Sequence, residues 1–253
     1  MSSTIPISPD SSHRIVLRDE LIRLYGDGGS TRGGLLRRFR LAWKLHTWAF
    51  IVGTTKALKR ILDVVISACA LVALLPLFAV VALLIKAYDG GPVIFRQKRV
   101  GRWGREFEFP KFRSMRVDAE ALKEKLLVQN HHGSSVTFKM KNDPRITPIG
   151  RVIRKLSIDE LPQLWCVLRG DMSLVGPRPP VPREVALYTL ADRRRLDAVP
   201  GLTCIWQISG RGDIPFDRQV ELDVQYIQSR SFWMDLLIIL KTVPAVLSGR
   251  GAY

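Results

Sequence analysis

The sequence predicts an α-rich α+β protein that is monotopic in a membrane, with one proline-broken re-entrant helix, interfacial helices and a small domain with short strands. Three observations support this class. One apolar run is long enough to enter a membrane but contains a proline near its middle. Several later stretches have helical spacing, and only a few short segments resemble strands. With 253 residues, of which 47% are apolar and 25% charged, the chain can bury a core and is not disordered as a whole.

Residues 1–55 are expected to form an N-terminal arm that is first polar and loosely ordered, then basic. The first ten residues lack the basic and apolar regions of a secretory signal. From residue 35 to residue 50, basic side chains alternate with Trp43, Trp48 and Phe50, a composition that suits a helix at a membrane surface. A solvated linker accounts for the same composition equally well, so both interpretations stay open.

Residues 56–90 are expected to hold the membrane helix. Residues 64–85 carry no charge, and as a helix they would be about 33 Å long against a hydrocarbon core of about 30 Å. Pro76 removes one helical hydrogen bond and should kink the helix. Both flanks are basic, and basic flanks favour the cytoplasmic side. A helix that enters, bends at Pro76 and leaves on the same face satisfies both flanks. The alternative, a buried helix of a soluble core, fits so long an apolar run less well.

Residues 91–253 are expected to form a cytosolic domain. The segments 93–95 and 107–109 predict two short strands, joined as a hairpin around Gly101 and Gly104. The segment 170–182 is rich in glycine and proline, which predicts irregular structure. Helices are predicted at 117–128, at 150–155, after Pro162, at 184–198 and at 216–247, where Pro244 can interrupt the last one, and a polar loop is predicted at 130–148.

The chain is strongly basic, with 39 Lys and Arg against 23 Asp and Glu and a net charge of +16. Such a charge attracts anionic partners: nucleic acid, anionic lipid or phosphorylated substrates. The three cysteines, Cys69, Cys166 and Cys204, are far apart and odd in number. They therefore predict neither a disulfide framework nor a metal knuckle, and a reducing compartment fits.

Two adjacent carboxylates, Asp159 and Glu160, precede Pro162 at the start of a predicted helix. At that end of a helix carboxylates stay ionised and phosphate binds well. An ionised aspartate can attack phosphorus to form an acyl phosphate, and a neighbouring carboxylate can hold Mg²⁺. The same segment also matches a capping box, Ser157-x-x-Glu160, which needs no catalysis. On this segment alone the capping box is the better interpretation.

Cations elsewhere in the chain favour a phosphate site. Arg178 stands between two prolines, which limits the backbone entropy lost when it binds phosphate. Lys111 and Arg113 follow a predicted strand, and Gln207 and Arg211 flank a Ser-Gly pair. Each cation alone is more often a solvated surface charge. Several such clusters of cations, all following one membrane segment, are harder to explain as solvated surface charges.

Short motifs follow the apolar helix in a fixed order, at residues 91–97, 111–115, 143–147, 157–163, 170–179, 200–203 and 249–251. Each is weak alone, but the ordered set is specific. Through these motifs, residues 59–253 resemble the bacterial sugar transferase family, the monotopic phosphoglycosyl transferases that act on polyprenol phosphate (polyprenyl-phosphate hexose-1-phosphate transferases).

The resemblance implies that the chain is a phosphoglycosyl transferase that moves a sugar 1-phosphate from a UDP-sugar to undecaprenyl phosphate and releases UMP. Such a reaction is the first membrane step of exopolysaccharide, O-antigen or glycoconjugate synthesis. It further implies a place in the lipid bilayer at the cytoplasmic face of the bacterial inner membrane, and dependence on Mg²⁺. Nucleic acid is not an expected partner, and a homodimer is plausible.

The resemblance also implies roles for individual residues. Asp159 matches the nucleophile that carries the phosphosugar. Glu160 matches its partner, which helps to bind Mg²⁺ or assists proton transfer, so the pair would hold the metal. Four cations, Lys111, Arg113, Arg154 and Arg178, match motif positions that hold the diphosphate or the lipid phosphate. Gln207 and Arg211 match a segment associated with the nucleotide end.

Three positions depart from the family pattern. Leu75 stands before Pro76 where serine is frequent, and leucine cannot bond the carbonyl that the proline leaves unpaired in lipid. Cys166 stands where asparagine is common, and Cys204 where glycine is common. Leu75 is expected to affect the geometry of the bend. Cys204 is expected either to tighten a turn near the nucleotide end or to shift the choice of substrate.

Two other functions stay open at this stage. The first is a membrane-anchored basic protein that binds nucleic acid or acidic lipid, which the net charge favours. Against it, the sequence has no helix-turn-helix, RRM or zinc signature. The second is a family member that organises an assembly complex without catalysis, against which the intact Asp159, Glu160 and Arg178 argue. No residue pattern selects the sugar or the downstream glycan.

Overall fold

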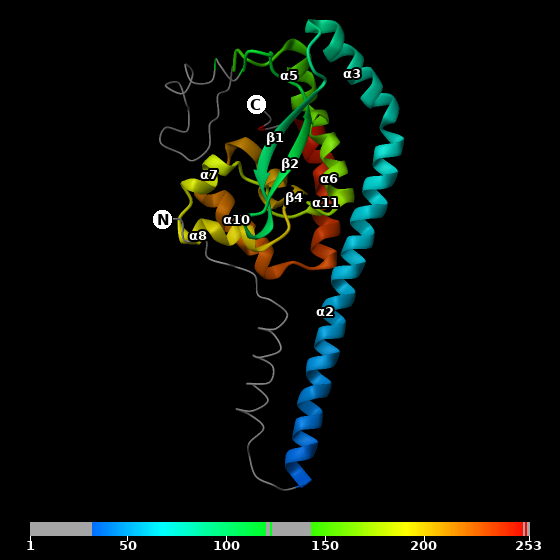
Figure 1. Ribbon diagram of the computed structural model, residues 1–253, viewed down its shortest axis with the longest axis vertical. Helices are drawn as coiled ribbons and strands as arrows, with labels where there is room; N and C mark the ends of the chain where they lie inside the picture. Colours follow the sequence, from blue (N-terminus) through cyan, green and yellow to red (C-terminus); the bar gives the residue numbers. More distant parts are fainter. Residues whose placement is uncertain (1–31, 120–121, 123–142, 250, 252–253) are drawn as a thin grey trace. The chain divides into compact units, whose positions relative to one another are not determined.

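The computed structural model describes residues 32–119, 122, 143–249 and 251 (Figure 1). The chain forms two compact units, residues 1–60 and residues 61–253. Most of the polar arm, most of the predicted helix at 117–128 and most of the loop at 130–148 lie outside the described residues. The described part is a helix-rich α+β structure, which confirms the predicted α-rich α+β class.

The apolar run forms a broken helix. Helix α2 spans Arg32–Ala73, α3 spans Leu75–Asp89, and the segments 53–73 and 75–89 meet at 58°. The break falls at Leu74, and Pro76 lies in the first turn of α3, where its missing N–H removes no bond that the helix needs. Among the described residues, no single helix has the length and hydropathy to cross a membrane, whereas this bent pair passes that test together.

A hairpin follows the broken helix. Strand β1 (Ile94–Val100) pairs antiparallel with β2 (Glu106–Phe112) through the short helix η1 (Arg102–Gly104). The predicted hairpin is confirmed, and both strands are longer than their apolar triplets indicated. Phe107 and Phe109 face inward, since side chains alternate along a strand and this face packs against the core.

Three short helices lie between residue 143 and the second sheet, in the part of the chain that the structure describes. They are α5 (Pro148–Lys155), η3 (Ile158–Gln163) and α6 (Leu164–Arg169). Both helices predicted here are therefore present. Thr147 caps α5 by accepting a hydrogen bond from the Gly150 N–H at 2.9 Å.

The segment predicted to be irregular contains a strand. Strand β3 (Ser173–Val175) pairs in parallel with β4 (Gly201–Thr203). Gly176 and Gly201 let the two backbones approach closely. A Cβ on Gly201 would lie 2.0 Å from the Gly176 nitrogen and would clash with it. This pairing is non-local, so the composition of residues 170–182 alone could not indicate it.

The single helix predicted at 184–198 is wrong. The chain instead forms α7 (Pro182–Ala186), α8 (Leu190–Arg193) and η4 (Arg194–Asp197). Thr189 starts a new helix because its Oγ1 accepts from the Asp192 N–H at 3.3 Å, while the Thr189 N–H donates to the Asp192 carboxylate at 2.8 Å. This reciprocal capping box outweighs the helical spacing of the charges around it.

Two long helices complete the chain, after the short helices α9 (Ile205–Ser209) and η5 (Arg211–Asp213). They are α10 (Phe216–Ser229) and α11 (Phe232–Ser248). The break lies at Arg230 and Ser231, and the prediction of a break before Pro244 is wrong. Ser231 Oγ accepts from the Met234 N–H at 3.2 Å and begins α11, and Pro244 lies inside that helix.

The main core joins the broken helix to the hairpin and the C-terminal helices. Ile66, Ala70 and Leu71 of α2 pack against it. Asp63 of α2 accepts a hydrogen bond from the Leu174 N–H of β3 at 3.0 Å, which ties the broken helix to the second sheet. The buried members of this core are Phe107, Phe109, Leu164, Cys166, Val167, Met172, Leu174, Val175, Tyr226 and Ile238.

Candidate active site

The two adjacent carboxylates lie in the first turn of η3. Ser157, just before the helix, has a left-handed backbone with φ of 53°, which is uncommon for a residue with a side chain. Its N–H donates to the Arg154 carbonyl at 3.0 Å, and its carbonyl accepts from the Glu160 N–H at 3.2 Å. The Ser157 side chain makes no capping hydrogen bond. The capping-box interpretation is therefore wrong, because the Ser157 hydroxyl accepts instead from Arg211 Nη2 at 3.3 Å.

Glu160 is held by two cations from distant parts of the chain. Both terminal guanidinium nitrogens of Arg178 donate to its carboxylate, Nη1 to Oε2 at 3.2 Å. Lys111 Nζ lies 3.4 Å from Oε1. Burial alone would raise the pKa of Glu160, but Arg178 and Lys111 outweigh it and hold this pKa well below its usual range. Glu160 therefore stays ionised and fixes the Arg178 loop and β2 to η3.

Asp159 is different from its neighbour. Its side chain is buried, with 6% of the residue exposed, and no hydrogen bond or ion pair to its carboxylate is found among the described residues. Burial, and then the charge of Glu160, raise the pKa of Asp159 to about 6, while Lys111, Arg154 and Arg178 oppose the shift. Asp159 is thus a carboxylate that is ionised at neutral pH, more basic than usual, and free to react.

Most of the predicted cations lie around this pair. Lys111 is half-buried at the end of β2, and desolvation, followed by the charges of Arg178 and Arg99 and against that of Glu160, lowers its pKa to about 8. Arg154, in the last turn of α5, lowers the pKa of Asp159 by its charge. Burial lowers the pKa of Arg211, which the Glu160 charge opposes. With Arg178, these half-buried side chains make a site with more positive than negative charge, suited to a polyanionic ligand.

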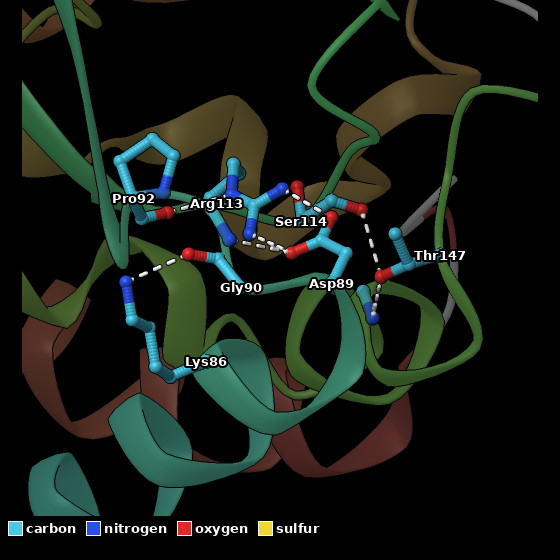
Figure 2. A network of polar contacts seen from close by, with 9 residues as sticks. Lys86, Asp89, Gly90, Pro92, Arg113, Ser114 and Thr147 are labelled. Atoms are coloured by element: carbon cyan, nitrogen blue, oxygen red, sulfur yellow. Dashed lines mark hydrogen bonds and ion pairs between the residues drawn. The ribbon is translucent and has the colours of Figure 1, made fainter.

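Arg113 is not brought to the carboxylate pair. Its guanidinium binds the Asp89 carboxylate at the end of α3, and its Nε donates to the Pro92 carbonyl at 2.6 Å (Figure 2). The same corner contains a bond from Lys86 Nζ to the Gly90 carbonyl at 2.7 Å. Arg113 therefore joins the exit of the broken helix to β2, so its position indicates a structural contribution rather than the predicted contact with phosphate.

The two residues predicted at the nucleotide end differ in their contacts. Arg211 is joined to Ser157, just before the carboxylate pair. Gln207, on α9, accepts a hydrogen bond from the buried Cys204 thiol at 3.1 Å. Burial raises the pKa of Cys204 well above its usual value, so this thiol stays protonated and acts as a donor. Cys204 therefore orients Gln207.

The donor set for a metal is small. Among the residues that the structure describes, no group of three or more His, Cys, Asp or Glu side chains could hold a metal ion. Asp159 and Glu160 provide two adjacent carboxylates, and Glu160 already binds Arg178 and Lys111. Mg²⁺ commonly uses one or two carboxylates together with substrate phosphates and water, so this pair fits Mg²⁺ as part of such a set.

The sequence reasoning missed Arg99 as a site residue and counted it only among the basic flanks of the apolar helix. Arg99 Nη1 donates to the Pro179 carbonyl at 2.9 Å, directly after Arg178. Strand alternation was the available signal, since Arg99 lies on the inner face of β1 whereas Lys98 is exposed.

Comparison with known proteins identifies the family. The sequence model of the bacterial sugar transferase family matches residues 54–249. The chain is 59% identical over 165 residues to the galactosyl transferase CpsE of Streptococcus agalactiae, covering 65% of this chain and 36% of that protein. It is 44% identical over 198 residues to the exopolysaccharide production protein ExoY of Sinorhizobium fredii, covering 77% and 88%.

A third relative is the undecaprenyl-phosphate galactose phosphotransferase of Salmonella typhimurium, which is 43% identical over 203 residues, covering 79% of this chain and 42% of that protein. The chain thus spans less than half of the Streptococcus and Salmonella proteins, and its match covers most of ExoY. The resemblance seen in the motifs is confirmed, as is the prediction of a transferase: the chain belongs to the bacterial sugar transferase family.

Proposed function

We propose that the chain transfers a sugar 1-phosphate from a UDP-sugar to undecaprenyl phosphate and releases UMP, with Asp159 as the covalent nucleophile. The observation that carries the proposal is the contrast between two adjacent carboxylates: Glu160 is paired with Arg178 and Lys111, whereas Asp159 has no such partner among the described residues. The Salmonella relative is named for undecaprenyl phosphate and galactose. A Caulobacter vibrioides relative, 41% identical, is named a UDP-glucose:undecaprenyl-phosphate glucose-1-phosphate transferase.

In the first half of the reaction, a carboxylate oxygen of Asp159 attacks the phosphorus that carries the sugar. The bond from this phosphorus to the bridging oxygen breaks, and UMP leaves with the bonding electron pair. The sugar phosphate remains on Asp159 as an acyl phosphate. The raised pKa of Asp159, about 6, makes its carboxylate a stronger nucleophile than an exposed aspartate while leaving it ionised at neutral pH.

In the second half, an oxygen of undecaprenyl phosphate attacks the same phosphorus. The bond to Asp159 breaks, and its carboxylate is restored. Both halves pass through phosphoryl groups with high negative charge, so positioning and charge neutralisation supply most of the catalysis. Lys111 and Arg178 lie beside Glu160, next to the nucleophile, and the structure supports them as the groups that hold this charge. Arg211, joined to Ser157, adds a cation on the side predicted for the nucleotide.

Asp159 and Glu160 would hold Mg²⁺ together with the phosphates of the substrate. Bound there, the ion would neutralise the diphosphate and make UMP a better leaving group. Both oxygens of Glu160 already contact cations, Oε2 with Arg178 and Oε1 with Arg178 and Lys111, so Mg²⁺ would share this carboxylate with them.

The broken helix supports a monotopic placement, at the cytoplasmic face of the bacterial inner membrane. A bend of 58° between two apolar segments lets the chain enter and leave the lipid on one side. Helix α11 also exposes large apolar side chains at helical spacing, which would rest in the membrane interface. They are Trp233, Leu237, Leu240, Val243 and Leu247. In this placement the lipid phosphate meets the site at the membrane surface, and the nucleotide sugar arrives from the cytosol.

UMP release is the direct test of the proposed function. The detergent-solubilised protein, with Mg²⁺ and undecaprenyl phosphate, is expected to release UMP from UDP-galactose or UDP-glucose, the two sugars that the relatives' names contain. UDP-linked N-acetylated sugars are tested alongside these two donors. Reactions without undecaprenyl phosphate serve as the control, because there only the first half can occur. Folded protein that releases no UMP from any of these donors would contradict the proposal.

A further inference from the structure

Arg99 occupies an unusual place for a structural arginine. It lies on the inner face of β1, and its guanidinium carbon is 5.0 Å from the centre of the Phe109 ring. Lys111 Nζ lies 5.2 Å from the centre of the same ring, so one aromatic side chain contacts both cations. Phe109 is fully buried in the core and therefore holds its place. Arg99 and Lys111 are thus fixed on a shared rigid support.

Arg99 also holds the loop that carries Arg178. Its Nη1 donates to the Pro179 carbonyl at 2.9 Å, and the next residue of β1 continues the contact, because the Val100 N–H donates to the Pro180 carbonyl at 2.9 Å. Arg178 immediately precedes these two carbonyls and binds Glu160 through both terminal nitrogens. The end of β1 therefore fixes the backbone from which the guanidinium of Arg178 reaches the carboxylate pair.

The environment of Arg99 is costly for stability. Its Nε is buried and has no hydrogen-bond partner among the described residues. Burial, and then the charge of Arg178, lower the pKa of Arg99 to about 10, opposed by Glu184 and Glu160. A buried cation with an unpaired donor destabilises a fold relative to an apolar side chain of similar size. Packing alone therefore does not account for an arginine at this position.

We propose that Arg99 is a positioning residue of the transferase site, which acts through Arg178 by holding the Pro179 carbonyl and placing the Arg178 guanidinium for the diphosphate of the nucleotide sugar. Arg99 and Lys111, held on Phe109, form one wall of the site, and Arg178 forms the adjoining wall. The inference rests on the proposed function, because it assigns Arg99 a part in the same reaction.

The test is a double-mutant cycle on kcat/KM for the UDP-sugar, with Arg99→Gln and Arg178→Lys. Arg99→Gln alone is expected to lower kcat/KM by about 30-fold, the effect typical of losing one hydrogen bond from a charged donor. In the Arg178→Lys background it should lower kcat/KM by no more than about threefold, because residues that act through one another are not additive. If the losses of kcat/KM caused by Arg99→Gln and by Arg178→Lys multiply in the double variant, the two residues act independently and the proposal is overturned.

Lys98→Gln is the matched control, since it removes the same charge from the exposed face of the same strand. It is expected to leave kcat/KM within about twofold of the unsubstituted enzyme. An equal effect of Arg99→Gln and Lys98→Gln would also overturn the proposal. If Arg99→Gln does not fold, Arg99→Lys replaces it in the same cycle, because lysine keeps the charge but lacks the planar fork. Failure of the unsubstituted protein to release UMP would contradict the proposed function itself, independently of Arg99.

Discussion

Asp159→Asn is expected to abolish turnover, lowering the rate of UMP release by at least about a thousandfold. An amide nitrogen or oxygen is a poor nucleophile and cannot form the acyl phosphate. Asparagine has the same shape, and no hydrogen bond to the Asp159 carboxylate is found among the described residues, so the substitution should not disturb packing. It also removes a buried charge whose pKa is raised, so the folded state should be at least as stable.

The measurement for Asp159→Asn combines UMP release with thermal unfolding and membrane association, all compared with the unsubstituted protein. Asp217→Asn provides the control, because Asp217 is exposed in the first turn of α10. This control should keep full activity. Full activity in Asp159→Asn would remove Asp159 as the nucleophile.

Arg178→Met is expected to lower kcat/KM by at least about a hundredfold, and Arg178→Lys by about tenfold. Methionine removes the cation that stands beside the reacting phosphoryl group and leaves Glu160 paired with Lys111 alone. Lysine restores the charge but cannot donate two parallel hydrogen bonds to the carboxylate. The order of the two variants therefore separates the contribution of charge from that of the guanidinium geometry.

Removing one partner of the half-buried Arg178–Glu160 ion pair also lowers stability, so kcat/KM must be calculated for the folded fraction measured by thermal unfolding. Arg183→Met is the control, because Arg183 is exposed on the neighbouring helix α7. It should change neither stability nor activity appreciably. Activity of Arg178→Met close to that of Arg183→Met would show that the Arg178 guanidinium does not act on the substrate.

Local signals in the sequence predicted much of the fold. Two short apolar segments with glycines between them predicted the β1–β2 hairpin, and the apolar run with Pro76 predicted a broken helix, although the break falls at Leu74. The parallel pairing of β3 with β4 was missed because it joins segments far apart in the chain. The helix predicted at 184–198 was wrong because one threonine cap, at Thr189, outweighed the charge spacing.

In the candidate site too, residues that are neighbours in the sequence were predicted, whereas roles that depend on tertiary contacts were not. Asp159 and Glu160 were found because they are adjacent in a motif. Arg113 and Arg99 could not be told apart from sequence, since both are cations on or next to a short strand. Only the tertiary partners separate them: Arg113 binds Asp89 at the end of α3, while Arg99 binds the loop that carries Arg178.

Covalent catalysis by Asp159 can be detected in the mass of the protein after reaction with Mg²⁺ and the UDP-sugar in the absence of undecaprenyl phosphate. We expect a mass increase equal to one sugar phosphate, located on the peptide that contains Asp159, with UMP released in no more than equal amount to the protein. Addition of undecaprenyl phosphate should then restore the original mass. UMP release that occurs only with undecaprenyl phosphate present, without any adduct on Asp159, would rule out the covalent intermediate and indicate direct transfer between the two substrates.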